Sequence, residues 1–317
     1  MRKLIIILFA IVALMSVSCH RKLLLEPGHH HGEEIFINID VDAEIDAEKG
    51  DDPAMYNDLL STMRTATIVA YPKSQTAEYR VHKIYGTSGS IWLMKGNYDI
   101  LVYTSDFYDL DGVYYRGVDV GPFTAEAFTN SALKSKDPAV KSFNMEDPDP
   151  LFAKLYEDFS VTGADTVKVA LEARSYKYWY EIEVEGLDYI TSAQLEIDGM
   201  YNTVFLADGS HRPDEFGSQR AKGEVFKDEN RVAGEFFSFG PHHDSEVKNS
   251  MVISFINGRT ITVPLNDMSA DIKKLTKGGK IMIKQKLVIN VGDDGSTFTP
   301  EVEGWEEEEV VIPILPY

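Results

Sequence analysis

The feature that most limits the fold is a two-residue hydrophobic period that returns in short segments along the chain. In residues 35–41, isoleucine and valine alternate with mostly polar residues, and residues 178–184 repeat this pattern with tyrosine, isoleucine and valine. Successive side chains of a strand point to opposite faces, so this period places the apolar residues on one face of a half-buried strand. No long amphipathic helix pattern occurs after residue 18. The chain is therefore predicted to be all-β.

Turn residues separate the strand candidates, which share alternation or enrichment in β-branched and aromatic residues. After the segment at 35–41, those in the first half are Thr67–Tyr71, Arg80–Tyr85, Ser90–Met94, Tyr98–Tyr103, Phe159–Val161 and Thr166–Ala173. Those in the second half are Lys177–Gly186, Ala193–Ile197, Tyr201–Leu206, Glu235–Phe239, Met251–Ile256, Arg259–Leu265 and Lys280–Val291. Asn257-Gly258 is the strongest hairpin signal.

The segments between these strands are predicted to hold little helix. Only Asp267–Thr276 has a helical pattern. Ala125–Leu133 is predicted to be a short helix or a loop, and Lys134–Leu155, with its three prolines, a long irregular connection. Many short strands punctuated by turns favour β-sandwiches. A length of 317 residues suits two domains, and we place them at 35–173 and 174–317, with the boundary near Ala173.

The first residues have the pattern of a bacterial lipoprotein signal peptide. Arg2 and Lys3 precede an apolar run from Leu4 to Met15, which is too short to cross about 30 Å of hydrocarbon. Cys19 lies where such signals place the acylated residue, although Ser16 replaces the usual leucine three positions earlier. Residues 1–18 are thus predicted to be removed. An ordinary signal peptide with an incidental thiol is the alternative.

Acylation of Cys19 would attach the remaining chain to a bilayer, since each buried methylene contributes roughly 0.8 kcal/mol. Residues 19–34 are predicted to be a tether, and their three consecutive histidines, His29–His31, are interpreted as part of a polar linker. The expected location is the outer membrane. Which face of the membrane displays the protein stays open, because the residues after Cys19 are basic rather than acidic.

Composition and missing motifs exclude several classes of function. A net charge of −20 argues against nucleic-acid binding, because phosphates repel such a surface. A single cysteine cannot form an internal disulfide or a multi-cysteine metal site. We find no nucleotide-binding glycine loop, zinc-protease motif or serine-hydrolase elbow. The chain is predicted to have no catalytic residues, no metal site and no cofactor.

Four groups of residues are candidates for binding a ligand or a partner, and most of them also have a simpler structural interpretation. An EF-hand calcium loop starting at Asp40 requires glycine at its sixth position and glutamate at its twelfth. This chain has Ile45 and Asp51 there, so an acidic strand end is the favoured interpretation. His242-His243-Asp244 is interpreted as a surface turn. Trp179 and Trp305 are candidate sugar-stacking residues, although the neighbouring Tyr178 and Tyr180 are expected in the core. The acidic run Glu306–Glu309 is read as a solvated segment, or as a contact for a partner's basic edge.

Three stretches resemble the fimbrillin-like lipoproteins of Bacteroidales, in particular the fimbrial anchor and minor-subunit group and its uncharacterised relatives. They are Ser18-Cys19-His20-Arg21, then Glu172–Tyr176 continuing through Ile182–Leu187 to Ala193–Met200, and Val302–Glu308. These motifs are structural and none is catalytic. The resemblance implies two tandem Greek-key sandwiches of the transthyretin-like type and a role in anchoring, or assembling with, surface fimbriae.

The resemblance also implies how subunits join, because in fimbrillins a strand of one subunit fills an open groove in another. Polymerising members lose an N-terminal segment by cleavage after an arginine; Arg64 is a candidate, but anchors keep this segment, and we favour a retained one. The terminal segment Phe298–Ile312 is the expected exchangeable strand. The leading hypothesis is a non-enzymatic outer-membrane lipoprotein acting as a fimbrial anchor or accessory subunit, with other surface subunits as partners. The alternative is a surface glycan-binding lipoprotein serving polysaccharide uptake.

Overall fold

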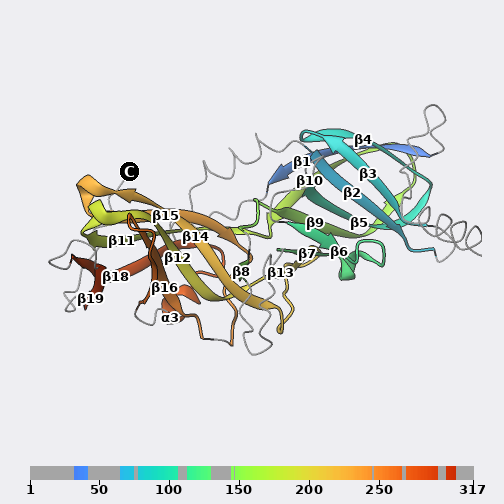
Figure 1. Ribbon diagram of the computed structural model, residues 1–317. Coiled ribbons are helices and arrows are strands. Elements are labelled where there is room, and N and C mark those ends of the chain that lie inside the picture. Colours follow the sequence, from blue (N-terminus) through green and yellow to red (C-terminus); the bar gives the residue numbers. More distant parts are fainter. Residues whose placement is uncertain are drawn as a thin grey trace, which may run out of the picture. The chain divides into compact units, whose positions relative to one another are not determined.

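The strands in the described part of the chain form three β-sheets (Figure 1). The computed structural model describes residues 32–41, 65–74, 78–105, 113–129, 144–145, 147–244, 246–265, 269–291 and 298–304. Helical structure in these ranges is limited to α3 (Ser269–Ile272) and the short 3-10 turns η2 (Pro122–Thr124), η3 (Leu187–Tyr189) and η4 (Lys227–Glu229). Within them, no helix has the length and apolar character needed to cross a membrane. The all-β prediction is confirmed.

The first sheet has seven strands in the order β3-β2-β5-β9-β10-β1-β4. They are β1 (Glu33–Val41), β2 (Thr65–Pro72), β3 (Arg80–Tyr85), β4 (Ser88–Leu93), β5 (Gly96–Ser105), β9 (Phe152–Val161) and β10 (Asp165–Ala173). β3 and β4 lie at opposite ends of this order, yet only Gly86 and Thr87 separate them. The sheet therefore curls round on itself. A φ of 73° at Gly86 fits the tight turn that this requires.

The inner face of the curled sheet holds a continuous apolar core. The alternating residues Ile35, Ile37 and Ile39 of β1 are buried here, as the two-residue period predicts. Other strands contribute further buried side chains to the same cluster: Ile68, Ile84, Ile91, Leu93, Ile100, Val102, Phe152, Val161, Val169 and Leu171. Every strand of this sheet thus supplies residues to one core, which fixes the register of each strand.

The second sheet has nine strands, eight of them in the order β17-β16-β12-β14-β15-β11-β18-β19, with β8 paired to β14. The strands are β8 (Asn144–Met145), β11 (Tyr176–Glu185), β12 (Ile190–Tyr201), β14 (Phe216–Phe226), β15 (Arg231–Ser238), β16 (Asn249–Phe255), β17 (Thr260–Pro264), β18 (Gly279–Val291) and β19 (Phe298–Gly304). Its core includes Tyr178 and Tyr180, as expected, and the ring of Tyr178 stacks on Phe236 at 5.2 Å. The hydroxyl of Tyr180 donates to the carbonyl of Ala221.

A third sheet of three short strands joins segments that lie far apart in the sequence. Its order is β13-β7-β6, formed by β6 (Tyr114–Arg116), β7 (Glu126–Phe128) and β13 (Thr203–Phe205). An apolar cluster beneath it takes Val69 and Leu101 from the first sheet, and Tyr201 and Phe239 from the second half of the chain. Strands from both halves therefore share this packing. The division into domains at Ala173 stays a prediction.

Several predicted connections contain strands instead. The stretch Ala125–Leu133, expected as a short helix or loop, contains β7, and Lys134–Leu155 contains β8 and the start of β9. Strand β14 departs from the sequence prediction, because its buried positions include small or polar residues such as Ser218 and Gln219, which give no apolar period. The Asn257-Gly258 turn does join β16 to β17, with a φ of 80° at Gly258.

Candidate subunit interface

Strand β1 lies inside the first sheet although it comes from the start of the described chain. It pairs in parallel with β10, from Ile35 with Asp165 to Val41 with Leu171. On its other side it pairs antiparallel with β4, from Glu33 with Leu93 to Asn38 with Ser88. Both backbone edges of β1 are thus used, and its isoleucines fill the core. β1 is therefore an interior strand of the first sheet, paired with β4 on one side and with β10 on the other.

Strand β19, unlike β1, lies at the edge of its sheet, at the end of the strand order of the second sheet. It pairs antiparallel with β18 over seven positions, from Gln285 with Gly304 to Val291 with Phe298. In the described part of the chain no strand pairs with its other edge, because β19 ends the strand order. An edge strand presents unpaired N–H and C=O groups that can template pairing with another chain. β19 belongs to the segment Phe298–Ile312 that the sequence singles out.

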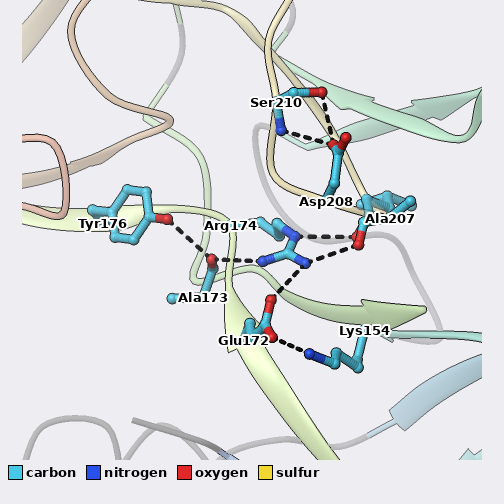
Figure 2. A network of polar contacts seen from close by, with 9 residues as sticks. Lys154, Glu172, Ala173, Arg174, Tyr176, Ala207, Asp208 and Ser210 are labelled. Atoms are coloured by element: carbon cyan, nitrogen blue, oxygen red, sulfur yellow. Dashed lines mark hydrogen bonds and ion pairs between the residues drawn. The ribbon is translucent and has the colours of Figure 1, made fainter. Parts of the chain in front are cut away.

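A buried arginine holds the junction between β10 and β11 (Figure 2). Arg174 is 3% exposed, and its guanidinium donates to the carbonyls of Leu206 at 3.1 Å and Ala207 at 3.2 Å. It also reaches the carboxylate of Glu172 at 3.1 Å, and Glu172 pairs with Lys154. Five N–H donors in a fixed fork suit several acceptors at once. The hydrogen bonds of Arg174 thus connect the turn after β13 with the end of β10.

A second charged cluster connects the third sheet to the loop before β14. Glu126 of β7 is fully buried, and its carboxylate accepts hydrogen bonds from Nε of Arg116 at 2.7 Å and Nε of Arg212 at 2.8 Å. Arg116 also donates to Glu215 at 2.6 Å. Burial raises the pKa of Glu126, but the hydrogen bonds from Arg212 and Arg116 outweigh burial and leave this pKa below its ordinary value. The carboxylate is therefore charged at neutral pH.

Of the predicted site residues, the structure describes only part. The described residues do not include Cys19, the His29–His31 run, Arg64 or Trp305. They also leave out the acidic residues that follow Val41 and the Glu306–Glu309 run. Trp179 faces away from the core that holds Tyr178 and Tyr180, is half-buried, and pairs with Glu235 of β15 and Lys280 of β18.

In the His242-His243-Asp244 cluster, His243 and Asp244 are exposed in a bend, as a surface turn predicts, whereas His242 departs from this prediction. His242 is buried, and its ring lies 4.2 Å from Phe216 and 4.9 Å from Tyr201. Nε2 of His242 bonds to the carbonyl of Pro213, and Nδ1 accepts from the N–H of Asp244. His211 stacks on the other side of Tyr201 at 4.1 Å. These rings pack a loop, and the described residues contain no group of three or more side chains suited to hold a metal ion.

The two charged clusters were missed by reasoning from the sequence. Arg174 drew attention only as part of the Glu172–Tyr176 motif, and Glu126 lies in a stretch that shows no strand period. An arginine between two strand candidates, next to a glutamate, is a weak signal of a buried junction. The partners of Glu126 come from positions 116 and 212. No local pattern could have connected them.

Comparison with solved structures finds similar proteins from Bacteroides and Porphyromonas. A crystal structure of a candidate adhesin from Bacteroides ovatus aligns with a TM-score of 0.56 and 15% identity, covering 92% of this chain and 99% of that one. The fimbrial anchor protein Mfa2 of Porphyromonas gingivalis aligns at 0.45 and 13%, covering 86% and 97%. Its tip fimbrial protein Mfa3, truncated at the C-terminus, aligns at 0.35 and 12%, covering 86% and 99%. The alignment with the Bacteroides ovatus protein shows a shared fold.

A family model matches residues 57–216, which is half of the chain. The chain belongs to the family described as "Domain of unknown function (DUF5119)". No curated protein matches its sequence.

Proposed function

We propose that this chain is a non-enzymatic outer-membrane lipoprotein that acts as a fimbrial anchor or accessory subunit and binds partner subunits by β-strand addition. The observation that carries the proposal is the last described strand, β19, which pairs with one neighbour, β18, and with no other strand in the described part of the chain. Main-chain hydrogen bonds supply affinity in strand addition, and pockets for alternate side chains supply specificity. The adhesin and fimbrial descriptions of the proteins with similar folds support this class of function.

Strand β1 supports the proposal from the acceptor side. Its position between β4 and β10 has the geometry of an inserted strand, with Ile35, Ile37 and Ile39 in the core and Phe36 pointing outward. In our proposal, β1 stays in place and closes the groove between β4 and β10, so the chain ends an assembly rather than extending it. Cleavage after Arg64 is not required. Domains at 35–173 and 174–317 would separate the closed groove from the exposed terminal strand.

Co-purification from detergent-solubilised membranes of fimbria-expressing cells tests partner binding. We expect a pilin-like subunit to be recovered with the full chain and to be lost when residues 298–317 are deleted. A chain with Glu306–Glu309 changed to glutamine is the matched control, because it keeps β19 and removes only the acidic run. Recovery of no pilin-like subunit with the full chain would contradict the proposal. Loss with the glutamine variant would assign binding to the acidic run instead.

Lipid attachment at Cys19 is tested separately. We expect labelling with radioactive palmitate and a processing step that globomycin blocks, both abolished by Cys19→Ala. The Ser18→Ala variant, which keeps the thiol, should still be labelled. Labelling that persists in Cys19→Ala would refute the lipid anchor and the proposed membrane location, without bearing on β19.

A glycan-binding surface protein is the second candidate function, and Trp179 favours it. This ring lies on an outward strand face beside Glu235 and Lys280, a combination of apolar and hydrogen-bonding groups that suits a sugar. A glycan array probed with the full chain tests it. Binding that is lost in Trp179→Ala or Trp305→Ala would favour this function over strand addition.

A further inference from the structure

The third sheet has an inward face that is packed and an outward face that is partly exposed. Its inward residues Tyr115, Ala127 and Val204 lie in register across β6, β7 and β13 and pack in the apolar cluster beneath the sheet. Successive residues of a strand point to opposite sides, so the residues flanking these three point outward. We call this surface the outer face; it is formed by Tyr114, Arg116, Glu126, Phe128, Thr203 and Phe205.

Aromatic rings supply the apolar part of the outer face. Tyr114 is 41% exposed, and its ring lies 5.6 Å from the ring of Phe128 on the neighbouring strand. Phe128 and Phe205 are half-buried. The guanidinium carbon of Arg116 lies 5.3 Å from the centre of the Phe128 ring, and that of Arg212 lies 5.4 Å from the centre of the Phe205 ring. Tyr114 is therefore the most accessible ring, and the other two are partly covered by arginines.

Two arginines supply the polar part of the outer face. Arg116 and Arg212 both contact the buried carboxylate of Glu126, and their own side chains are 41% and 47% exposed. A guanidinium has five N–H groups. The hydrogen bonds to Glu126 and Glu215 use only Nε and Nη2 of each arginine. Within the described part of the chain, Nη1 of both arginines therefore remains a hydrogen-bond donor without an acceptor.

Charge and size limit what the outer face can bind. The positive charges of Arg116 and Arg212 are balanced by the carboxylates of Glu126 and Glu215, which they contact. An uncharged ligand with acceptor oxygens therefore fits this face better than an anion does. Three strands of three residues each cover about 10 Å by 10 Å, or roughly 100 Å². A standard protein interface buries about 800 Å² on each partner, so this face suits a small ligand.

We propose that the outer face binds an uncharged oligosaccharide, with one sugar ring stacked on Tyr114 and hydroxyl oxygens accepting hydrogen bonds from Nη1 of Arg116 and Arg212. A pyranose ring has an apolar side of C–H groups and a rim of hydroxyl groups. It therefore matches an aromatic ring flanked by fixed donors. Phe205 lies two strands from Tyr114, roughly 10 Å away, so the face extends beyond a single sugar ring. The carboxylate of Glu215, 33% exposed, supplies an acceptor for a hydroxyl group.

This inference goes beyond strand addition and does not depend on it, because the outer face shares no residue with β1 or β19. It also differs from the glycan reading of Trp179, which lies on β11 of the second sheet. Loss of sugar binding would leave co-purification through β19 unaffected, and failure of co-purification would leave sugar binding unaffected. The outcomes are therefore distinguishable.

Isothermal titration calorimetry of the full chain tests the site. The probes are oligosaccharides of β-glucan, xylan and α-mannan, with oligogalacturonate as the anionic comparison. We expect saturable binding of an uncharged probe, with a Kd at least about tenfold higher in Tyr114→Ala. Tyr114→Phe keeps the ring and should bind at least about fivefold more tightly than Tyr114→Ala. Tyr189→Ala is the matched control, because it removes a tyrosine that is 36% exposed in the second half of the chain, and it should bind like the unaltered chain.

A second variant tests the donors. Arg212→Lys keeps a positive charge near Glu126 but removes the planar fork, and the Kd should rise at least about fivefold in a chain that urea denaturation shows to be folded. No saturable binding of the uncharged probes at up to about 1 mM would overturn the proposal, as would binding that Tyr114→Ala leaves intact. Binding of oligogalacturonate alone would overturn the uncharged ligand class. Binding that is lost in Trp179→Ala but kept in Tyr114→Ala would place the sugar on the second sheet and overturn this site.

Discussion

At the residue scale, Glu126 is the clearest case of a charge that depends on its partners. A buried carboxylate loses its hydration, and two arginines replace it. We expect Glu126→Gln to lower the free energy of unfolding by about 2 kcal/mol, measured by urea denaturation, because Arg116 and Arg212 then face a neutral amide. Glu215→Gln, which removes a more exposed carboxylate from the same cluster, is the control and should cost less than about 1 kcal/mol. Equal effects would mean that burial of Glu126 does not matter.

His82 makes stability depend on pH. Burial, and then the nearby charge of Arg80, lower the pKa of His82 from 6.5 to about 4, and its buried Nε2 has no partner among the described residues. Between pH 6.5 and about pH 4, His82 is protonated in the unfolded chain but stays neutral in the folded chain. Stability therefore falls as the pH is lowered through this window, by up to about 3 kcal/mol. Urea denaturation at several pH values should show the free energy of unfolding falling with pH in this window. The fall should be smaller in His82→Leu.

Two other residues, His211 and Arg80, help to interpret that experiment. His211 also has a pKa lowered by burial, so a smaller slope of the same sign should remain in His82→Leu. Arg80→Gln is the matched control, because it removes the nearby charge and leaves the buried ring. A His82→Leu chain with the full slope would assign the pH dependence to other groups.

At the scale of single elements, β1 allows a comparison of its two faces. Ile37 is buried in the core, whereas Phe36, the next residue, is 41% exposed. We expect Ile37→Ala to lower the free energy of unfolding by about 2–4 kcal/mol and Phe36→Ala by less than about 1 kcal/mol. Urea denaturation of both variants measures the difference. Similar costs would mean that β1 is not held by its inward face and would weaken its interpretation as an inserted strand.

The same period explains which elements the sequence could predict. In β1 and β11, apolar and polar residues alternate because one face of each strand is more buried than the other. This alternation predicts both strands from the sequence. β9 was missed in part because its middle is polar and irregular: Asp158 has a φ of 55°, and the pairing with β5 shifts register between Tyr98 and Ile100. β8 has two residues, too few for any period. Its place beside β14 depends on tertiary pairing alone.

At the scale of the whole molecule, Arg174 and the third sheet decide whether the described strands unfold together. Arg174 ties the turn after β13 to β10, and β13 pairs with β7. Since each of these contacts joins the first half of the chain to the second, we expect one cooperative thermal transition for the unaltered chain. In Arg174→Ala, the carbonyls of Leu206 and Ala207 lose their donor, and the transition should broaden or split, because the halves then unfold at different temperatures.

Differential scanning calorimetry measures this through the ratio of the calorimetric to the van't Hoff enthalpy. We expect a ratio near one for the unaltered chain and above one for Arg174→Ala. Arg231→Ala is the matched control, because that arginine pairs with Glu229 and Glu181 within the second sheet, and its loss should leave the ratio near one. If Arg174→Ala only lowers the transition temperature and keeps the ratio near one, then the shared apolar cluster around Tyr201 and Phe239 couples the two halves without help from the arginine.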